Sequence, residues 1–222
     1  MIQTGSIQAV TFDVGGTLID PWPSVGHVYA DVAARNGFRD LDPEELNRRF
    51  GEAWRAKANF DYSRAAWSEI VAKTFYGSGG SAEEISFFPD LYERFTAPDV
   101  WRVYDEVEGT LGRLKQCGMK LGVISNWDER LRPLLKDLKL DHFFEVILVS
   151  AELGEQKPSA AIFQKVLQEL HLPAQAVLHV GDSPQEDVEG ARRAGLHAVR
   201  VNRSGRGVAP GEIGSLAELL RL

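Results

Sequence analysis

Short apolar runs rich in valine, isoleucine and leucine recur along the chain and set the strongest limit on its fold. They lack the strict alternation of a strand with one wet face, so we expect strands that are covered on both faces. Strands of this kind, alternating with helices, are typical of a doubly wound parallel α/β sheet with right-handed crossovers. The predicted strands are Gln8–Asp13, Lys120–Ser125, Val146–Ser150, Ala176–Gly181 and Ala198–Asn202.

Helical patterns lie before, between and after the last four of these runs. Apolar residues recur there at the spacing of one helix face, and several segments begin at a residue suited to capping. The predicted helices are Glu106–Cys117, Asp128–Leu138, Ser159–Leu170, Pro184–Ala194 and Ser215–Leu220.

The stretch that follows the first predicted strand has a different pattern. Between Asp20 and about Pro98 the sequence shows amphipathic segments and no comparable strand. Asp42-Pro43-Glu44-Glu45 is typical of a helix start, with a cap before proline and acids in the first turn. We therefore predict a core of residues 1–20 and 99–222, with an inserted helical cap of residues 21–98. The expected cap helices are Ser24–Asn36, Pro43–Ala58, Ser63–Phe75 and Ala82–Phe95.

Composition limits the possible partners. The 222-residue chain has a formal net charge of −7, which argues against nonspecific binding to nucleic acid or to an anionic membrane. No apolar run approaches the ~20 residues needed to span a bilayer. Its single cysteine, Cys117, has no internal partner, and we expect a semi-buried structural thiol. A cytoplasmic location fits these features, while the oligomeric state stays open.

Polar side chains stand at or just past the ends of three predicted strands: Asp13, Ser125 and Asp182. In open α/β sheets ligands bind at this edge, where the strand order reverses. The helices that follow add N–H groups suited to phosphate. Two acids brought together there need a cation between them, and an oxygen-only site with few protein ligands suits Mg²⁺.

Four segments in order carry a family resemblance: Phe-Asp13-Val-Gly-Gly-Thr-Leu, Val-Ile-Ser125-Asn, Gln-Lys157-Pro and Gly-Asp182-Ser-Pro-Gln-Glu-Asp187. With them the chain resembles the haloacid dehalogenase-like superfamily of hydrolases over nearly its whole length. The first segment is similar to the rhythmically-expressed-gene-2-like branch. The resemblance implies a Rossmann-like core, a helical cap and a Mg²⁺-dependent hydrolase, most simply a phosphatase of a small phosphate ester.

The same resemblance implies a role for each matching residue. Asp13 is expected to attack phosphorus and form an aspartyl-phosphate, with Ser125 and Lys157 holding the phosphoryl group. Asp13, Asp182 and the main-chain carbonyl of Gly15 are expected to bind Mg²⁺, with Asp187 supporting the metal from behind. The expected substrate-binding residues are Gly16, Thr17, Asn126 and Trp127, and Trp127 is expected to wall the pocket.

Gly15 departs from the pattern of the phosphatases that the chain resembles, which carry an aspartate two residues after the nucleophile. That aspartate protonates the leaving group, and general acid–base catalysis is worth ~10²–10⁴-fold. We therefore expect low turnover on alkyl phosphates. Two alternatives stay open: a non-catalytic protein that binds phosphate and metal, and a haloacid dehalogenase, against which Asp182 and Asp187 count.

Plainer interpretations of these residues also stay open. Ser125 can be a strand-end hydroxyl, Lys157 a surface lysine, and Asp187 an acid in a first helical turn. Asp128 is expected to cap the helix that follows Trp127, although it is also a candidate replacement acid. The other candidate acid is His27 in the first cap helix, whereas His179, inside a predicted strand, is expected to be structural.

Overall fold

The computed structural model describes residues 7–58, 60–79, 85–203 and 209–221. The chain divides into two compact units, a core of Met1–Ile19 and Val103–Leu222 and a cap of Asp20–Arg102. The sequence pattern predicts boundaries after residues 20 and 98, whereas the two units divide after residues 19 and 102. A short two-stranded sheet, β2 (Ile19–Pro21) and β3 (Trp101–Val103), lies at the two connections between the units.

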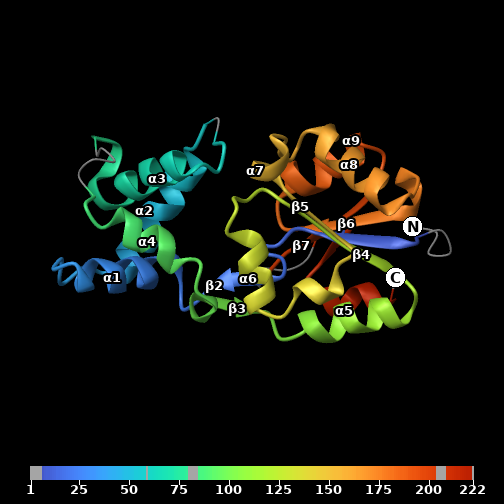
Figure 1. The fold of residues 1–222 in the computed structure, drawn as a ribbon, viewed down its shortest axis with the longest axis horizontal. Coiled ribbons are helices and arrows are strands. Elements are labelled where there is room, and N and C mark those ends of the chain that lie inside the picture. The colour runs from blue at the N-terminus through green and yellow to red at the C-terminus, as the bar shows by residue number, and fades with distance from the viewer. Residues whose placement is uncertain (1–6, 59, 80–84, 204–208, 222) are drawn as a thin grey trace. The chain divides into compact units, whose positions relative to one another are not determined.

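The core unit is built on a six-stranded sheet in the order β5-β4-β1-β6-β7-β8, and its recorded strand pairs are parallel (Figure 1). Five strands of this sheet, all except β8, confirm the predicted strands to within one residue at each end. The two-residue β8 and the β2–β3 pair are too short to leave an apolar run and were not predicted. The strands are β1 (Ala9–Phe12), β4 (Lys120–Ser125), β5 (Val146–Val149), β6 (Val177–Gly181), β7 (His197–Val201) and β8 (Glu212–Ile213).

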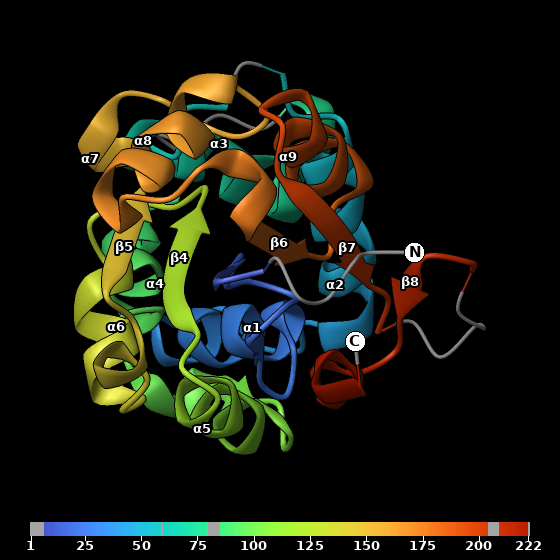
Figure 2. The ribbon, with the colours of Figure 1, turned by 90° about the vertical axis from the view of Figure 1, so that its right-hand side faces the viewer.

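Helices cover both faces of this sheet. Figure 2 shows α8 and α9 on one side and α5 on the other, next to the C-terminal 3₁₀ turn Leu216–Arg221. Under α8, the side chains of Phe163 and Val166 pack with Ile124 of β4 in a fully buried apolar cluster. The core helices are α5 (Val107–Gln116), α6 (Leu131–Asp137), α7 (Ser150–Leu153), α8 (Ala160–Leu170) and α9 (Gly190–Arg193).

Two core helices differ from their predictions. The helix expected from Asp128 begins at Leu131, because the Asp128 carboxylate accepts hydrogen bonds from the main chain and guanidinium of Arg130 instead of capping the helix. The helix expected over 184–194 begins as the π-helical segment Pro184–Glu189 and continues as the short α9. Its cap is Ser183, whose hydroxyl accepts from the main-chain N–H of Glu186.

The cap unit is helical, as the pattern indicates. Its elements are α1 (Val25–Arg35), α2 (Pro43–Arg55), α3 (Arg64–Tyr76) and α4 (Phe88–Arg94). Asp42 caps α2 as predicted, its carboxylate accepting from the N–H of Glu44. The fourth expected helix is shorter than predicted and starts at Phe88. Residues 82–84 of that prediction lie outside the described residues.

Aromatic side chains fill the interior of the cap unit. Phe60 lies at the centre of one group, with ring centroids 5.3 Å from Trp54, 4.9 Å from Tyr62 and 5.0 Å from Trp67. Tyr29 of α1 stacks on Phe75 of α3 at 5.8 Å. Aromatic pairs at these separations stabilise the cap unit beyond the burial of their area.

Within the described part of the chain, no helix combines the length and the apolar character that crossing a membrane requires.

Candidate active site

The strand order brings the strand-end residues of the sequence analysis together. The chain runs from β1 outward through β4 to β5 and then returns to β6 on the other side of β1, so the order reverses at β1. Asp13 directly follows β1, Ser125 ends β4, and Asp182 directly follows β6. Ligands bind at such reversal points in open parallel sheets.

The loop after Asp13 is tightly wound. The carbonyl of Val14 accepts hydrogen bonds from the N–H groups of Thr17, Leu18 and Ile19. Gly16 has φ +70°, and a Cβ there would lie 2.8 Å from Oδ2 of Asp182. Only glycine is compatible with both this backbone conformation and this close approach, so Gly16 allows the loop to lie against Asp182. Because glycine has no side chain, residue 16 can offer a substrate only its main chain.

Asp13 forms a buried ion pair with Lys157. The Nζ of Lys157 lies 2.7 Å from Oδ1 of Asp13, which also accepts a 3.0 Å hydrogen bond from the hydroxyl of Ser125. Burial and the nearby carboxylate of Asp187 raise the pKa of Asp13, while Lys157 opposes that rise. Lys157 itself is buried, yet its two carboxylate partners raise its pKa, so it stays charged. The alternative of a surface lysine is therefore wrong.

Asp187 lies behind Lys157 and is fully engaged. Its Oδ1 is 2.6 Å from Nζ of Lys157 and 3.2 Å from Nε2 of His179, and its Oδ2 accepts from the N–H of Ser183. Burial works against the charged form, but Lys157 and His179 outweigh it and lower the pKa of Asp187. With both oxygens occupied, Asp187 orients Lys157 rather than facing the pocket.

His179 is a member of this network that the sequence analysis treated as merely structural. It is fully buried in β6, and its Nδ1 lies 3.0 Å from the hydroxyl of Thr11 on β1. Burial lowers the pKa of His179, which keeps the ring neutral beside Asp187. The available signal was a histidine inside an otherwise apolar strand three residues before Asp182, since a buried ring there needs polar partners on both nitrogens.

Asn126, expected to bind substrate, holds the Lys157 segment instead. Its amide donates to the main-chain carbonyl of Lys157 and to the Glu186 carboxylate, and its carbonyl accepts from the N–H of Lys157. Thr17, also expected to bind substrate, is fully buried, and its main-chain carbonyl accepts from the guanidinium of Arg203. Neither side chain faces outward as a substrate-binding group would.

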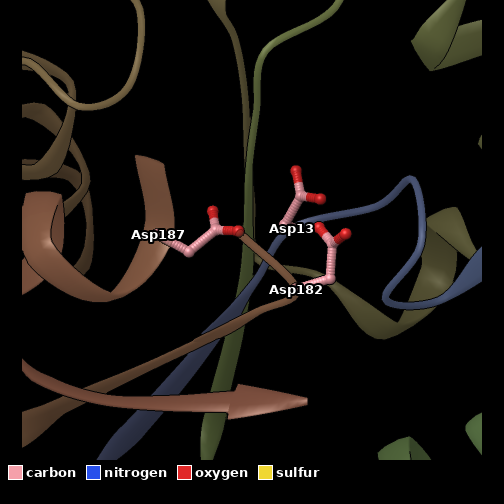
Figure 3. A group of neighbouring side chains, drawn as sticks. All are labelled: Asp13, Asp182 and Asp187. Carbon is pink, nitrogen blue, oxygen red and sulfur yellow. The ribbon is translucent and has the colours of Figure 1, made fainter. Parts of the chain in front are cut away.

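Three carboxylates form the one acidic group in the described residues that could hold a metal ion (Figure 3). One oxygen each from Asp13, Asp182 and Asp187 lies within 4.8 Å of the others. The carboxylate of Asp182 lies among packed protein atoms although the residue as a whole is exposed. That desolvation, together with the charges of Asp13 and Asp187, raises its pKa to about 7.

These acids fit a hard divalent cation. Asp13 and Asp182 repel one another without a cation, and their donors are oxygens only, which is the set that Mg²⁺ prefers. Asp187 is engaged by Lys157, His179 and Ser183, so it fits a supporting role.

Gly15 faces the indole of Trp127. A Cβ built on Gly15 would lie 3.2 Å from Cζ3 and 4.0 Å from Cη2 of that ring. Trp127 follows the end of β4, and Ser150 fixes its main chain by accepting from the N–H and donating to the carbonyl, each at 3.0 Å. An aromatic ring thus stands in tight contact with the position where a side chain at residue 15 would begin.

The remaining candidates have partners close to them in the sequence or, for Cys117, a different exposure than expected. Asp128 is buried and paired with Arg130 at 2.6 Å, which makes it a poor replacement acid. His27 in the cap unit shares a 2.7 Å contact with Ser24 at the start of α1. Cys117 is exposed just past the end of α5, so the expectation of a semi-buried thiol is wrong.

Comparison with known proteins agrees with this arrangement. The chain is 30% identical to the Rhythmically expressed gene 2 protein of Drosophila melanogaster, over 87% of this chain and 82% of that protein. It is 34% identical to a phosphoglycolate phosphatase of Chromobacterium violaceum, over 88% and 85%. A HAD phosphatase from Thermococcus onnurineus has a similar structure, with a TM-score of 0.69, 27% identity and 97% coverage of both chains.

The sequence family described as haloacid dehalogenase-like hydrolase matches residues 10–201, which include Asp13, Ser125, Lys157, Asp182 and Asp187. That match spans most of the chain and confirms the resemblance seen in the four segments. The chain therefore belongs to the haloacid dehalogenase-like hydrolase family.

Proposed function

We propose that the protein is a Mg²⁺-dependent phosphatase of small phosphorylated metabolites in the cytoplasm, with Asp13 as its nucleophile. The observation that carries the proposal is the Asp13–Lys157–Asp187 arrangement at the sheet edge, with Ser125 on the same oxygen of Asp13. A phosphatase among the relatives and another among the similar structures support it.

Four residues have separate roles in the proposed phosphoryl transfer. Asp13 attacks phosphorus and displaces the leaving oxygen, which forms an aspartyl-phosphate that water then hydrolyses. Lys157 neutralises the nucleophile and the phosphoryl oxygens, and Asp187 keeps its ammonium aimed at Asp13. The hydroxyl of Ser125, now 3.0 Å from Asp13, is available to donate to a phosphoryl oxygen.

Asp13 and Asp182, with the main-chain carbonyl of Gly15, are the groups we assign to Mg²⁺. When bound, the cation would offset the charge of the acids and of the phosphate dianion. This assignment accounts for an Asp182 whose pKa is raised to about 7 by desolvation and by its acidic neighbours.

A screen of phosphate monoesters with Mg²⁺, run beside Asp13→Asn, tests the proposal. We expect phosphate release by the native protein and none by the variant. A rapid burst of alcohol or phenol release, matched by phosphate bound to Asp13, would mark the covalent intermediate. Equal activity in Asp13→Asn would overturn the proposal.

A second candidate is a non-catalytic protein that binds phosphate and metal. It is favoured by one observation: residue 15 is a glycine without an acidic group, and the indole of Trp127 lies against the position where its side chain would begin. Phosphate binding in the presence of Mg²⁺, with no burst on any ester, would support the binding protein over the enzyme. Halide release from a 2-haloacid is the corresponding test for a dehalogenase.

A further inference from the structure

The position beside Gly15 is bordered by one side chain. Among the described residues, atoms of the Trp127 indole alone lie within 4 Å of a Cβ built there. Gly15 does not have positive φ, so its backbone would accept a side chain. The indole therefore borders this position, and the two ring atoms that it presents there are hydrocarbon.

Trp127 lies beside Gly15, in the loop that follows the strand carrying Ser125. Gly15 is two residues past Asp13, and Trp127 is two residues past Ser125, whose hydroxyl bonds Asp13. Ser150 fixes the main chain of Trp127 from both sides. The main chain of Trp127 is thus held at the ends of β4 and β5, and β4 also carries the Ser125 hydroxyl that bonds Asp13.

We infer that Trp127 is a specificity-determining residue that selects phosphate esters with an aryl leaving group. This inference rests on the proposed phosphatase function. A leaving group beside Gly15 finds no acid at that position, so it must be a weak base. It also meets an aromatic hydrocarbon surface, and ring pairs of this kind are worth about 0.5–1.5 kcal/mol beyond the area that they bury. An aryloxide satisfies both conditions, whereas an alkoxide satisfies neither.

The reaction balances without an acid at residue 15. An Asp13 oxygen forms a bond to phosphorus as the bond from phosphorus to the aryl oxygen breaks. The aryloxide leaves with the bonding electron pair and takes its proton from water. A second water then attacks the aspartyl-phosphate, which releases inorganic phosphate and restores the carboxylate.

The test compares Trp127→Ala and Trp127→Phe with the native protein on 4-nitrophenyl phosphate and acetyl phosphate, two substrates whose leaving groups need no acid. We expect Trp127→Ala to lower kcat/KM for the aryl ester roughly 2- to 12-fold more than for acetyl phosphate, the fold-change that corresponds to a ring pair. Trp127→Phe should restore most of that difference. An equal loss on both substrates would overturn the inference.

Binding separates this inference from the catalytic proposal. Phenylphosphonate and methylphosphonate, which carry no leaving oxygen, can be titrated calorimetrically with Mg²⁺ present. We expect the native protein to bind phenylphosphonate more tightly and Trp127→Ala to lose that preference. If the protein prefers phenylphosphonate but hydrolyses no ester, Trp127 remains the selecting residue and the proposed phosphatase activity is overturned. If the protein hydrolyses esters but Trp127→Ala does not change the preference for phenylphosphonate, the phosphatase proposal stands and the inference about Trp127 is overturned.

The shared space can be tested by stability alone. Gly15→Ala places a methyl group 3.2 Å from the indole, so it should lower Tm in the native background. In the Trp127→Ala background the same change should lower Tm by less, because the ring is gone. Equal shifts in the two backgrounds would mean that the ring does not occupy the residue-15 position.

Discussion

The two units of the chain are built on opposite principles. Among the buried polar or charged side chains in the described residues, Thr74 alone belongs to the cap unit, and its hydroxyl bonds the carbonyl of Ile70 within its own helix. The core unit buries Asp13, Lys157, His179 and Asp187 in one connected network at the sheet edge.

This contrast indicates what each unit can tolerate. In the cap, aromatic rings pack against one another, so a substitution is felt mainly through volume. In the core network, every charge depends on a partner, so removing one leaves another buried and unpaired. We expect charge changes in the core to affect catalysis and metal binding, and volume changes in the cap to affect stability alone.

Asp13→Asn should have the largest effect on activity. The amide cannot act as the nucleophile, so we expect phosphate release to fall on the order of 10⁴-fold or more. Steady-state assays with and without Mg²⁺ would measure it. Asp137→Asn, at an exposed acid at the end of α6, is the control and should leave the rate unchanged. Residual activity within tenfold of the native rate would remove Asp13 from its role.

Lys157→Met should be the most destabilising change in the core, because it leaves Asp13 and Asp187 buried without a cation. Breaking a buried pair in this way typically costs about 3–5 kcal/mol. The loss should grow as pH rises. Unpaired acids have a folded pKa above their unfolded value, so the folded state binds more protons at low pH and loses that advantage as pH increases. Urea unfolding at pH 5.5 and pH 8 would measure both effects.

A matched control for that change is Lys165→Met. Lys165 pairs with Glu169 at 2.7 Å on the exposed face of α8, one turn apart. Exposed pairs of this type contribute about 0.3–0.5 kcal/mol. A similar loss in both variants, or a Lys157→Met loss that does not change with pH, would contradict the idea that the core network depends on charge.

Phe60→Ala should destabilise the cap unit, because it leaves a cavity among Trp54, Tyr62 and Trp67. Large-to-small changes of this kind cost about 3–5 kcal/mol when the site cannot collapse. Phe38→Ala is the matched control at a ring that is 43% exposed, and it should cost less. Calorimetric scans would give both values, and Mg²⁺ affinity should be unchanged in each. A loss of Mg²⁺ affinity in Phe60→Ala would break the contrast between the units.

The sequence allowed much of the core to be predicted, because buried strands leave apolar runs. The Lys120–Ser125 run was placed with both ends correct. Asp128 was misplaced as a cap because Arg130 supplies it with a nearby cation and N–H. The local sequence pattern alone does not show whether the Asp128 carboxylate bonds the first N–H groups of the helix or Arg130.

The site was predictable as a set of residues and less so as a set of contacts. Asp13 and Lys157 meet as expected, the first directly after a strand and the second in a loop. The ion pair of Lys157 with Asp187, which lies in the helical segment Pro184–Glu189, was not predicted. The role of His179 depends on Thr11 and Asp187, which come from other elements. The ring of Trp127 beside Gly15 likewise depends on side-chain direction, which periodicity does not specify.

Asp182→Asn should give the smallest shift, and it tests the metal site directly. Without a cation, the pKa of Asp182 is raised to about 7 from its ordinary 3.8, so the folded state binds more protons than the unfolded state between those values. This group's contribution to stability therefore falls as pH rises from about 4 to about 7. At pH 8, Mg²⁺ at 100 times its Kd should stabilise the native protein by about 2.7 kcal/mol, a rise in Tm of several degrees.

In Asp182→Asn the carboxylate that depends on the cation is gone. The metal-free variant should match or exceed the native Tm at pH 8, and its Tm should hardly respond to Mg²⁺. Thermal scans at pH 5 and pH 8, with Mg²⁺ or with a chelator, would show both effects, and Asp137→Asn should behave as the native protein does. If Mg²⁺ raised the Tm of Asp182→Asn as much as that of the native protein, the cation would bind elsewhere. Cation binding would then not explain why Asp13, Asp182 and Asp187 lie together at the carboxyl ends of the strands.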